Sequence, residues 1–292
     1  PITSVADLIA GSDASRLYAD YVESHWLELI ERYDPWILWS DIGYPPGYEL
    51  PKLWAHFYNH KPDGVVNDRW MQTPRFLFSR LGRAILMQMI RRMPGGKSPQ
   101  APHFDFVTPE YATLDEISPT KWETCRGIGH SFGYNQFESA DEYQRADDLI
   151  HLLADVVSKN GNLLLNVGPC ADGSIHPAQQ AALEGLGRWL QANGESIYGT
   201  QPWHRYKDTD PNGGEVRYTS KGRTLYVIVI DPPQGSVLAL PPDIEGETSL
   251  LETGEMLKAE RSGDRFLITL PPRPGDQWIP ALRIHQTTDS KP

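Results

Sequence analysis

The chain is poor in cysteine, with only Cys125 and Cys170 among 292 residues. Two cysteines without a C-x-x-C spacing form neither a disulfide framework nor a typical zinc site, so we expect two buried free thiols. A Walker-type phosphate loop and an H-E-x-x-H zinc motif are also missing. The sequence therefore gives no reason to expect a metal or another cofactor.

Long apolar runs and an excess of positive charge are absent as well. No run approaches the roughly 20 apolar residues of a membrane-spanning helix, and the formal net charge of -11 disfavours general nucleic-acid binding. The sequence lacks an N-x-S/T glycosylation acceptor and opens on Pro1 rather than Met. We expect a soluble protein, and the sequence does not decide between a cytoplasmic and an exported one.

Helical and strand-like segments alternate over the first two thirds of the chain. Helical spacing is found at 15–33, 50–60, 139–159 and from Pro177 to about 193, and short apolar strands at 36–41, 65–70, 104–111, within 122–132 and at 161–169. Such alternation indicates parallel βα units. Because each strand ends in polar residues and a loop, we predict a TIM-type (β/α)8-like barrel, whose chemistry lies at the carboxyl ends of its strands.

Only five barrel strands can be counted, whereas closure needs eight. We therefore expect a barrel that is incomplete at its N-terminus, so that the chain is the later part of a longer polypeptide or works beside another chain. Exposed barrel edges would also favour self-association into a homo-oligomer. After residue 199 the pattern changes to short, turn-bounded strands. We predict a barrel domain over 1–199 and a small antiparallel β-sandwich over 200–292.

The segment 71–101 contains six basic residues and no acid, in a chain that is otherwise acidic. Its apolar residues recur at helical spacing. A basic amphipathic helix can contact a membrane surface or a partner. An inserted helix packed on the rim of the barrel would have the same composition, and we expect this second arrangement.

Two carboxylates follow predicted strands, Asp41 in WILWSD and Glu110 in VTPEY. Paired carboxylates facing each other across a barrel mouth are the usual equipment of glycoside hydrolysis, in which one attacks the anomeric carbon and the other protonates the leaving oxygen. The structural alternative is that each carboxylate caps a helix or pairs with Arg69 or Arg126.

Aromatic and basic residues surround this predicted pair. Trp39 lies two positions before Asp41, so strand alternation directs both side chains to the same side. Arg69 is placed to hydrogen-bond sugar hydroxyls, or else to form a salt bridge with Asp68 or Asp41. Phe132 would add a second aromatic surface to the same site.

The segment GHSFG, which contains Ser131, matches the nucleophile motif G-x-S-x-G of α/β-hydrolases. That motif needs a helix directly after the serine, whereas helical spacing resumes only from about Ser139. Asp172 and His204 are the downstream residues that would complete a triad, and nothing in their surroundings marks them. A serine hydrolase is therefore a remote alternative.

Six segments, read together and in order, resemble the α-L-fucosidases of glycoside hydrolase family 29. They are LWSDIGYP, VNDRW, FDFVTPEY, KWETCRGIGHSFGYN, GNLLLNVGP and the run from GSIHP to SIYGT. The resemblance extends over more than half of the chain, and GHSFG falls inside one of its segments. It implies a retaining hydrolase that removes terminal α-L-fucose from oligosaccharides or glycoconjugates through a covalent fucosyl-enzyme, without a metal.

The resemblance also implies roles for individual residues. Asp41 is similar to the family's nucleophile and Glu110 to its general acid/base, while Trp39, Arg69 and Phe132 are similar to residues that line the fucose subsite. Two further carboxylates are alternatives for the acid/base role, namely Glu123 and Glu116. Ser40 stands where asparagine is common in the family.

Families of this kind begin their catalytic domain further upstream, with strands whose histidines hold fucose hydroxyls. The resemblance thus implies both catalytic carboxylates but only part of the sugar pocket, together with a complementing N-terminal segment. The alternative is a catalytically inactive carbohydrate-binding or scaffold fragment. The family's C-terminal β-sandwich corresponds to the predicted domain at 200–292.

Overall fold

The computed structural model describes residues 16–41, 43–72, 101–211, 213–233, 235–273 and 278–286, with isolated positions between 74 and 88 and position 275. All six basic residues of the segment 71–101 lie outside the described residues. The basic helix predicted there therefore stays a prediction. The chain divides into two compact units, Pro1–Thr108 and Pro109–Pro292. Each unit is described by itself.

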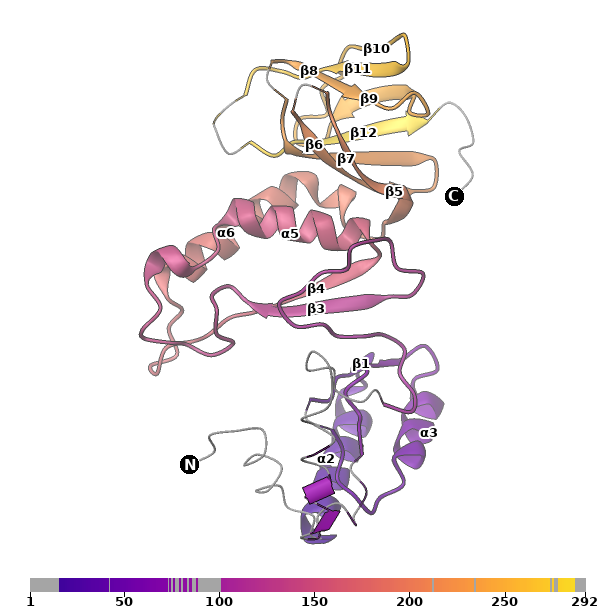
Figure 1. Cartoon of the computed structure of the whole chain (residues 1–292), viewed down its shortest axis with the longest axis vertical. Coiled ribbons are helices and arrows are strands. Elements are labelled where there is room, and N and C mark those ends of the chain that lie inside the picture. Colours follow the sequence, from indigo (N-terminus) through magenta and orange to yellow (C-terminus); the bar gives the residue numbers. More distant parts are fainter. Residues whose placement is uncertain are drawn as a thin grey trace. The chain divides into compact units, whose positions relative to one another are not determined.

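The described residues of unit 1 form two helices and one pair of parallel strands (Figure 1). Helix α2 (Arg16–Tyr33) precedes strand β1 (Ile37–Leu38), and helix α3 (Leu50–His60) precedes strand β2 (Val65–Val66). Strands β1 and β2 pair in parallel, as a βα unit requires. A proline in the first turn of α3 suits a helix start, because its missing N–H would have no partner there.

An aromatic-rich core holds unit 1 together. It gathers the buried faces of both helices and both strands, from Ile30, Leu38, Tyr44, Leu50, Leu53, Trp54, Phe57, Val66, Trp70 and Ala101. Trp70 is fully buried, and its ring lies 4.7 Å from that of Trp26 and 6.0 Å from that of Tyr44. The residues that directly follow β1 and β2 are thus held by a packed core.

Unit 2 begins with a second parallel pair, β3 (Trp122–Gly127) and β4 (Gly161–Asn166). Helices α5 (Ala146–Ser158) and α6 (Pro177–Asn193) lie between this pair and the antiparallel sheets in Figure 1. Short 3₁₀ turns, η3 (Ala140–Glu142) and η4 (Gly194–Ser196), precede α5 and follow α6.

Two antiparallel sheets complete unit 2. The larger has the strand order β5-β6-β7-β12-β9, and the smaller has the order β10-β11-β8. Their bounds are β5 Gln201–Thr209, β6 Glu215–Lys221, β7 Thr224–Asp231, β8 Val237–Leu240, β9 Gly246–Leu250, β10 Ala259–Ser262, β11 Arg265–Thr269 and β12 Ala281–Gln286. Apolar side chains from both sheets form one shared core, as in a β-sandwich.

Strand β7 explains how the helices and the sandwich hold together. Leu225, Val227 and Val229 belong to the core between the sheets, whereas Ile228 and Ile230 belong to a second core with α5 and α6. Since alternate side chains of a strand point to opposite faces, a strand buried on both faces must be apolar throughout. This accounts for the run TLYVIVI in the sequence.

The structure corrects three of the predicted strands. The predicted strands 36–41 and 65–70 pair with each other only at Ile37–Leu38 and Val65–Val66. The predicted strand 104–111 is not continuous, and makes isolated parallel bridges at Phe106 and Glu110. Among the described sheets the parallel strands form two-stranded pairs, so a closed barrel remains a prediction. The antiparallel sheet begins at Gln201, and the domain boundary at 199/200 also remains a prediction, because the compact units divide after Thr108.

Charged groups also join the helical layer of unit 2 to its larger sheet. Lys159 donates to Asp155 Oδ2 at 2.7 Å and to the Leu114 carbonyl at 2.7 Å, while Arg217 Nε of β6 donates to Asp155 Oδ1 at 2.9 Å. In η4, directly after α6, Glu195 accepts hydrogen bonds from Arg283 and from the Tyr226 hydroxyl.

The Glu195 contacts predict an acid-sensitive contribution to stability. Partial burial opposes ionisation of this carboxyl group, but the bonds from Arg283 and Tyr226 outweigh it and lower the pKa of Glu195 below its usual value. A lowered folded-state pKa stabilises the fold above the unfolded-state pKa, and the contribution is lost as pH falls through the folded-state value. We expect Glu195→Gln to lower the free energy of unfolding at pH 7 by roughly 0.5–1 kcal/mol.

Urea unfolding at pH 7 and at pH 3 measures this effect. The difference between the two proteins should shrink at pH 3, because Glu195 is then increasingly protonated. Glu184→Gln, at an exposed position on α6, is the matched control and should cost less at pH 7. An equal cost of Glu195→Gln at both pH values would contradict the expectation.

Candidate active site

The candidate nucleophile follows a buried hydrogen-bond pair. The Ser40 N–H donates to Asn67 Oδ1 at 2.9 Å, and Asn67 Nδ2 donates to the Ser40 carbonyl at 2.7 Å. Asn67 is fully buried and Ser40 nearly so. The amide side chain continues the pairing of β1 with β2 beyond the last ladder residue. Consequently Ser40 points inward, while Asp41 is exposed and Trp39 half-buried.

The turn after Asp41 depends on Gly43. Its φ of +97° lies in the left-handed region, and an added Cβ would overlap the Met71 carbonyl oxygen. Tyr44 N donates to that same oxygen at 2.9 Å. The Ser40 hydroxyl donates to the Gly43 carbonyl at 3.2 Å, so serine satisfies the turn at the position where the family commonly has asparagine.

Arg69 brings together three of the predicted site residues within unit 1. Its Nη1 donates to Asp41 Oδ1 at 3.1 Å, and its guanidinium carbon lies 4.9 Å from the centre of the Trp39 ring. The Arg69 side chain is 20% exposed and that of Asp41 is 62% exposed. The mostly buried Arg69 side chain thus orients the accessible carboxylate of Asp41, and the Trp39 ring lies beside the guanidinium. The contact is also the ion pair that the structural alternative expected, and geometry alone fits both interpretations.

Two residues that the sequence interpretation did not assign to the site hold Arg69 from behind. Thr108 accepts from Arg69 Nε at its hydroxyl and from Nη2 at its carbonyl, both at 2.7 Å. Asp68 Oδ1 accepts from the Thr108 N–H at 3.0 Å and from the Thr108 hydroxyl at 2.7 Å. Asp68 lies inside the motif VNDRW and Thr108 is the first residue of TPEY, so the motifs themselves were the available signal in the sequence.

In unit 2, the residues before and after Glu110 form backbone hydrogen bonds with Cys125 of β3. Cys125 N donates to the Pro109 carbonyl at 3.0 Å, and Tyr111 N donates to the Cys125 carbonyl at 3.1 Å. The Glu110 side chain is exposed. Tyr111 adopts a φ of +49°, an uncommon backbone conformation for a residue with a side chain.

Phe132, the remaining predicted subsite residue, lies against Tyr111. The two rings meet edge to face with centroids 5.1 Å apart, and each side chain remains more than a third exposed. The Tyr111 hydroxyl accepts from Gly127 N at 3.1 Å, and the guanidinium of Arg126 lies 5.2 Å from the ring centre. Tyr111 is therefore a third neighbour of the predicted site residues that the sequence interpretation did not assign, and its position next to Glu110 was the available signal.

The alternative acid/base candidates lie elsewhere in unit 2. Glu123 is half-buried on β3, opposite Asn162 of β4, and Glu116 is exposed in the segment that precedes β3. The choice among these carboxylates remains a prediction.

The three residues of the serine-hydrolase alternative each have other neighbours. Asn135 donates to the Ser131 hydroxyl, Asp172 accepts from Ser174, and His204 Nε2 lies 3.0 Å from Asp243 Oδ2. The first helical turn after Ser131 is η3, which begins at Ala140. A nucleophile elbow needs a helix at the serine itself, so the local fold does not suit that mechanism.

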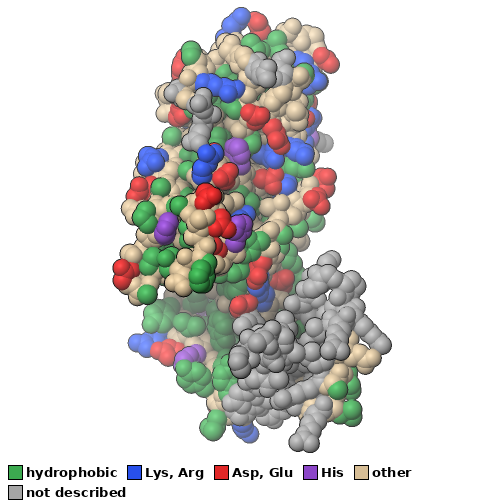
Figure 2. Space-filling view, turned by 60° about the vertical axis from the view of Figure 1, so that its left-hand side comes forward, with side chains coloured by type: hydrophobic (Ala, Val, Ile, Leu, Met, Phe, Trp, Pro, Cys, Tyr) green, Lys and Arg blue, Asp and Glu red, His purple; other side chains and the backbone are tan. Residues whose placement is uncertain are grey.

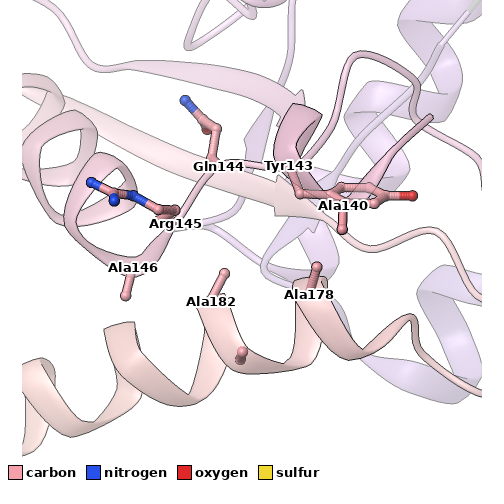
Figure 3. Close-up of a pocket in the computed structure, with 8 residues that line it drawn as sticks. Ala140, Tyr143, Gln144, Arg145, Ala146, Ala178 and Ala182 are labelled. Atoms are coloured by element: carbon pink, nitrogen blue, oxygen red, sulfur yellow. The ribbon is translucent and has the colours of Figure 1, made fainter.

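Two hollows in the described part of unit 2 lie apart from Glu110 and Phe132, and the larger, of about 400 Å3, is lined by residues that include Lys121, Asn160 and Trp203. A hollow of about 250 Å3 between η3, the start of α5 and α6 is lined mainly by alanine, with Ala146 facing Ala182 across it (Figure 3). Over the described residues, His, Cys, Asp and Glu form no group of three arranged to hold a metal ion. No described helix is long and apolar enough to cross a membrane. Acidic and basic side chains are intermixed on the face shown in Figure 2.

Comparison with known proteins places these residues in a family. The α-L-fucosidase family model matches residues 9–195. An α-L-fucosidase of Branchiostoma floridae is 35% identical over 225 residues, which is 73% of this chain and 43% of that protein. This chain belongs to the α-L-fucosidase family. The curated members of this family are glycoside hydrolases by name, and the motifs identify glycoside hydrolase family 29.

Other α-L-fucosidases are similar to this chain as well. The human tissue enzyme is 31% identical over 259 residues, covering 85% of this chain and 50% of its own length. The structure of the Thermotoga maritima α-fucosidase with a mechanism-based inhibitor superimposes with a TM-score of 0.76 at 35% identity, covering 98% of this chain and 61% of that one. This chain spans about half the length of the curated fucosidases that it matches.

The Asn67 pair at the α-L-fucosidase motif predicts a large loss of stability on substitution. Asn67→Leu keeps the approximate volume but leaves the buried Ser40 N–H and carbonyl without partners, each at a cost of about 1–3 kcal/mol. We expect the free energy of unfolding to fall by roughly 2–4 kcal/mol, measured by urea titration. Asn162→Leu, at an exposed position on β4, is the matched control and should cost about 0.5 kcal/mol or less. Equal effects of the two substitutions would show that the Asn67 pair does not stabilise the fold.

Proposed function

We propose that this chain carries the catalytic carboxylates of a retaining α-L-fucosidase, which removes terminal α-L-fucose from oligosaccharides or glycoconjugates. The observation that carries the proposal is the ion pair between Arg69 and the exposed Asp41 beside Trp39, in a chain of the α-L-fucosidase family. An accessible carboxylate that is oriented by a fixed cation has the properties a glycosidase nucleophile needs.

In the first step, a carboxylate oxygen of Asp41 attacks the anomeric carbon of fucose and the glycosidic bond breaks. Glu110 gives its proton to the departing oxygen, so the leaving group departs as an alcohol. In the second step, Glu110 removes a proton from water, the water oxygen attacks the anomeric carbon, and Asp41 is released. Two inversions give net retention of configuration, and no metal takes part.

The neighbouring side chains suit fucose binding. Arg69 offers N–H donors to sugar hydroxyls from a fixed position, and the half-exposed rings of Trp39 and Phe132 offer flat surfaces to the apolar parts of the sugar. The solved Thermotoga maritima α-fucosidase is described in complex with fucose and in complex with a mechanism-based inhibitor. These descriptions support the same substrate class for this chain.

The architecture proposed for the catalytic form is a TIM-type barrel followed by the β-sandwich at 200–292. The parallel pairs β1-β2 and β3-β4, with α3 after β1, α5 after β3 and α6 after β4, supply part of the repeat. We infer that further βα strands complete the barrel, either from an upstream segment of the same polypeptide or from a complementing chain.

Replacing the proposed nucleophile tests the function directly. With an aryl α-L-fucoside as substrate, we expect Asp41→Ala to lower kcat by several orders of magnitude, because no covalent intermediate can form. Added azide should restore turnover in Asp41→Ala and yield the fucosyl azide of inverted configuration, since a small anion can occupy the space of the carboxylate. Asp63→Asn, an exposed acid of the same unit, is the matched control and should retain activity.

Glu110→Gln should slow the hydrolysis of a fucoside with a poor leaving group far more than that of an aryl fucoside, whose leaving group needs little protonation. The same behaviour in Glu123→Gln or Glu116→Gln would move the acid/base role to that residue. Activity that survives Asp41→Ala without azide would overturn the proposal. Fucose binding by calorimetry without turnover, both in this chain and in a longer polypeptide with the upstream strands, would instead indicate a non-catalytic carbohydrate-binding protein.

A further inference from the structure

One edge of the Arg69 guanidinium binds Thr108 twice. Its Nε donates to the Thr108 hydroxyl and its Nη2 to the Thr108 carbonyl, both at 2.7 Å. The remaining described bond, from Nη1 to Asp41 Oδ1, is longer at 3.1 Å. Thr108 is 5% exposed, and its two acceptor oxygens match the parallel N–H directions of the guanidinium.

Asp68 determines which way the Thr108 hydroxyl points. A hydroxyl has one proton to donate and two lone pairs to accept with. Because Asp68 Oδ1 takes that proton at 2.7 Å and also accepts the Thr108 N–H at 3.0 Å, a lone pair of the hydroxyl stays available to Arg69 Nε. The chain of hydrogen bonds therefore has one direction, from Arg69 through Thr108 to Asp68.

We propose that Thr108 and Asp68 are positioning residues that fix the Arg69 guanidinium against the carboxylate of Asp41. An arginine side chain that is held only at its backbone end can adopt many rotamers. The clamp removes that freedom before substrate binds, so the cation is already in place when charge shifts at Asp41. This inference rests on the proposed function, in which Asp41 is the nucleophile.

Thr108→Val and Thr108→Ser form the matched pair that tests the clamp. Valine keeps the shape of threonine and loses the hydroxyl, whereas serine keeps the hydroxyl. The readout is solvent exchange of the Arg69 Nε–H proton by NMR, with the resonance identified by its loss in Arg69→Lys. We expect exchange to be about tenfold faster in Thr108→Val, as for a lost hydrogen bond of about 1.4 kcal/mol. Thr108→Ser should restore slow exchange.

Asp68→Ala removes the acceptor that orients the hydroxyl, and it should also speed exchange of the Nε–H while Arg69 itself is unchanged. Thermal unfolding of each variant checks that the fold is kept. If the Nε–H exchanges as slowly in Thr108→Val as in the unaltered chain, Thr108 does not hold Arg69 and the inference is wrong. This measurement needs no enzymatic activity, so it stands apart from the test of the proposed function.

Steady-state kinetics provide a second test of the clamp. We expect Thr108→Val to lower kcat/KM on an aryl α-L-fucoside by roughly 10- to 100-fold, the cost of a misplaced catalytic neighbour. In an Arg69→Lys background the same substitution should change kcat/KM by about twofold or less, because the group on which Thr108 acts is gone. Equal losses in both backgrounds would show a structural role that does not act through Arg69, and would refute the proposal even if Asp41 is the nucleophile.

Discussion

The reciprocal hydrogen bonds between Asn67 and the Ser40 backbone are the constraint on which unit 1 of this family member depends. Strands β1 and β2 pair over only two residues each, too few to direct the chain beyond them. The buried amide extends that pairing by one step. Asp41 comes directly after Ser40, and Arg69 comes two residues after Asn67, so one buried side chain sets where both candidate site residues lie.

In unit 2 the helices α5 and α6 and the two antiparallel sheets pack as layers, and the larger sheet contributes to both cores. Strand β7 contributes one face to the sandwich core and the other to the helices, and Arg217 and Lys159 meet Asp155 at the same junction. Apolar burial supplies most of the adhesion, while the paired charges fix the register of α5 against β6. This packing thereby supports the segment that contains Glu110 and the contacting rings of Tyr111 and Phe132.

The sequence was a good guide wherever a local pattern determines structure. Helices α3 and α6 follow from apolar periodicity and from an early proline, and β4 from an apolar run that begins after Asn160. The segment 104–111 was a poorer case, because a strand exists only where a neighbour offers a partner. The motifs pointed to Trp39, Asp41 and Arg69, which the structure brings into contact and whose roles stay predictions. Asp68 was considered only as an ion-pair partner of Arg69 and Thr108 was not considered, because the two lie 40 positions apart and no spacing rule predicts a hydrogen bond between them.

The backbone pairing at Cys125 has a consequence for chemical labelling. Its thiol is buried, while its N–H and carbonyl bind the residues on either side of Glu110. An alkylating reagent that reached this sulfur would need space that the native packing does not offer, and its adduct would displace the strand that holds Glu110. Loss of activity after such treatment would thus report damage to the support of a carboxylate, although it would resemble the signature of a catalytic thiol.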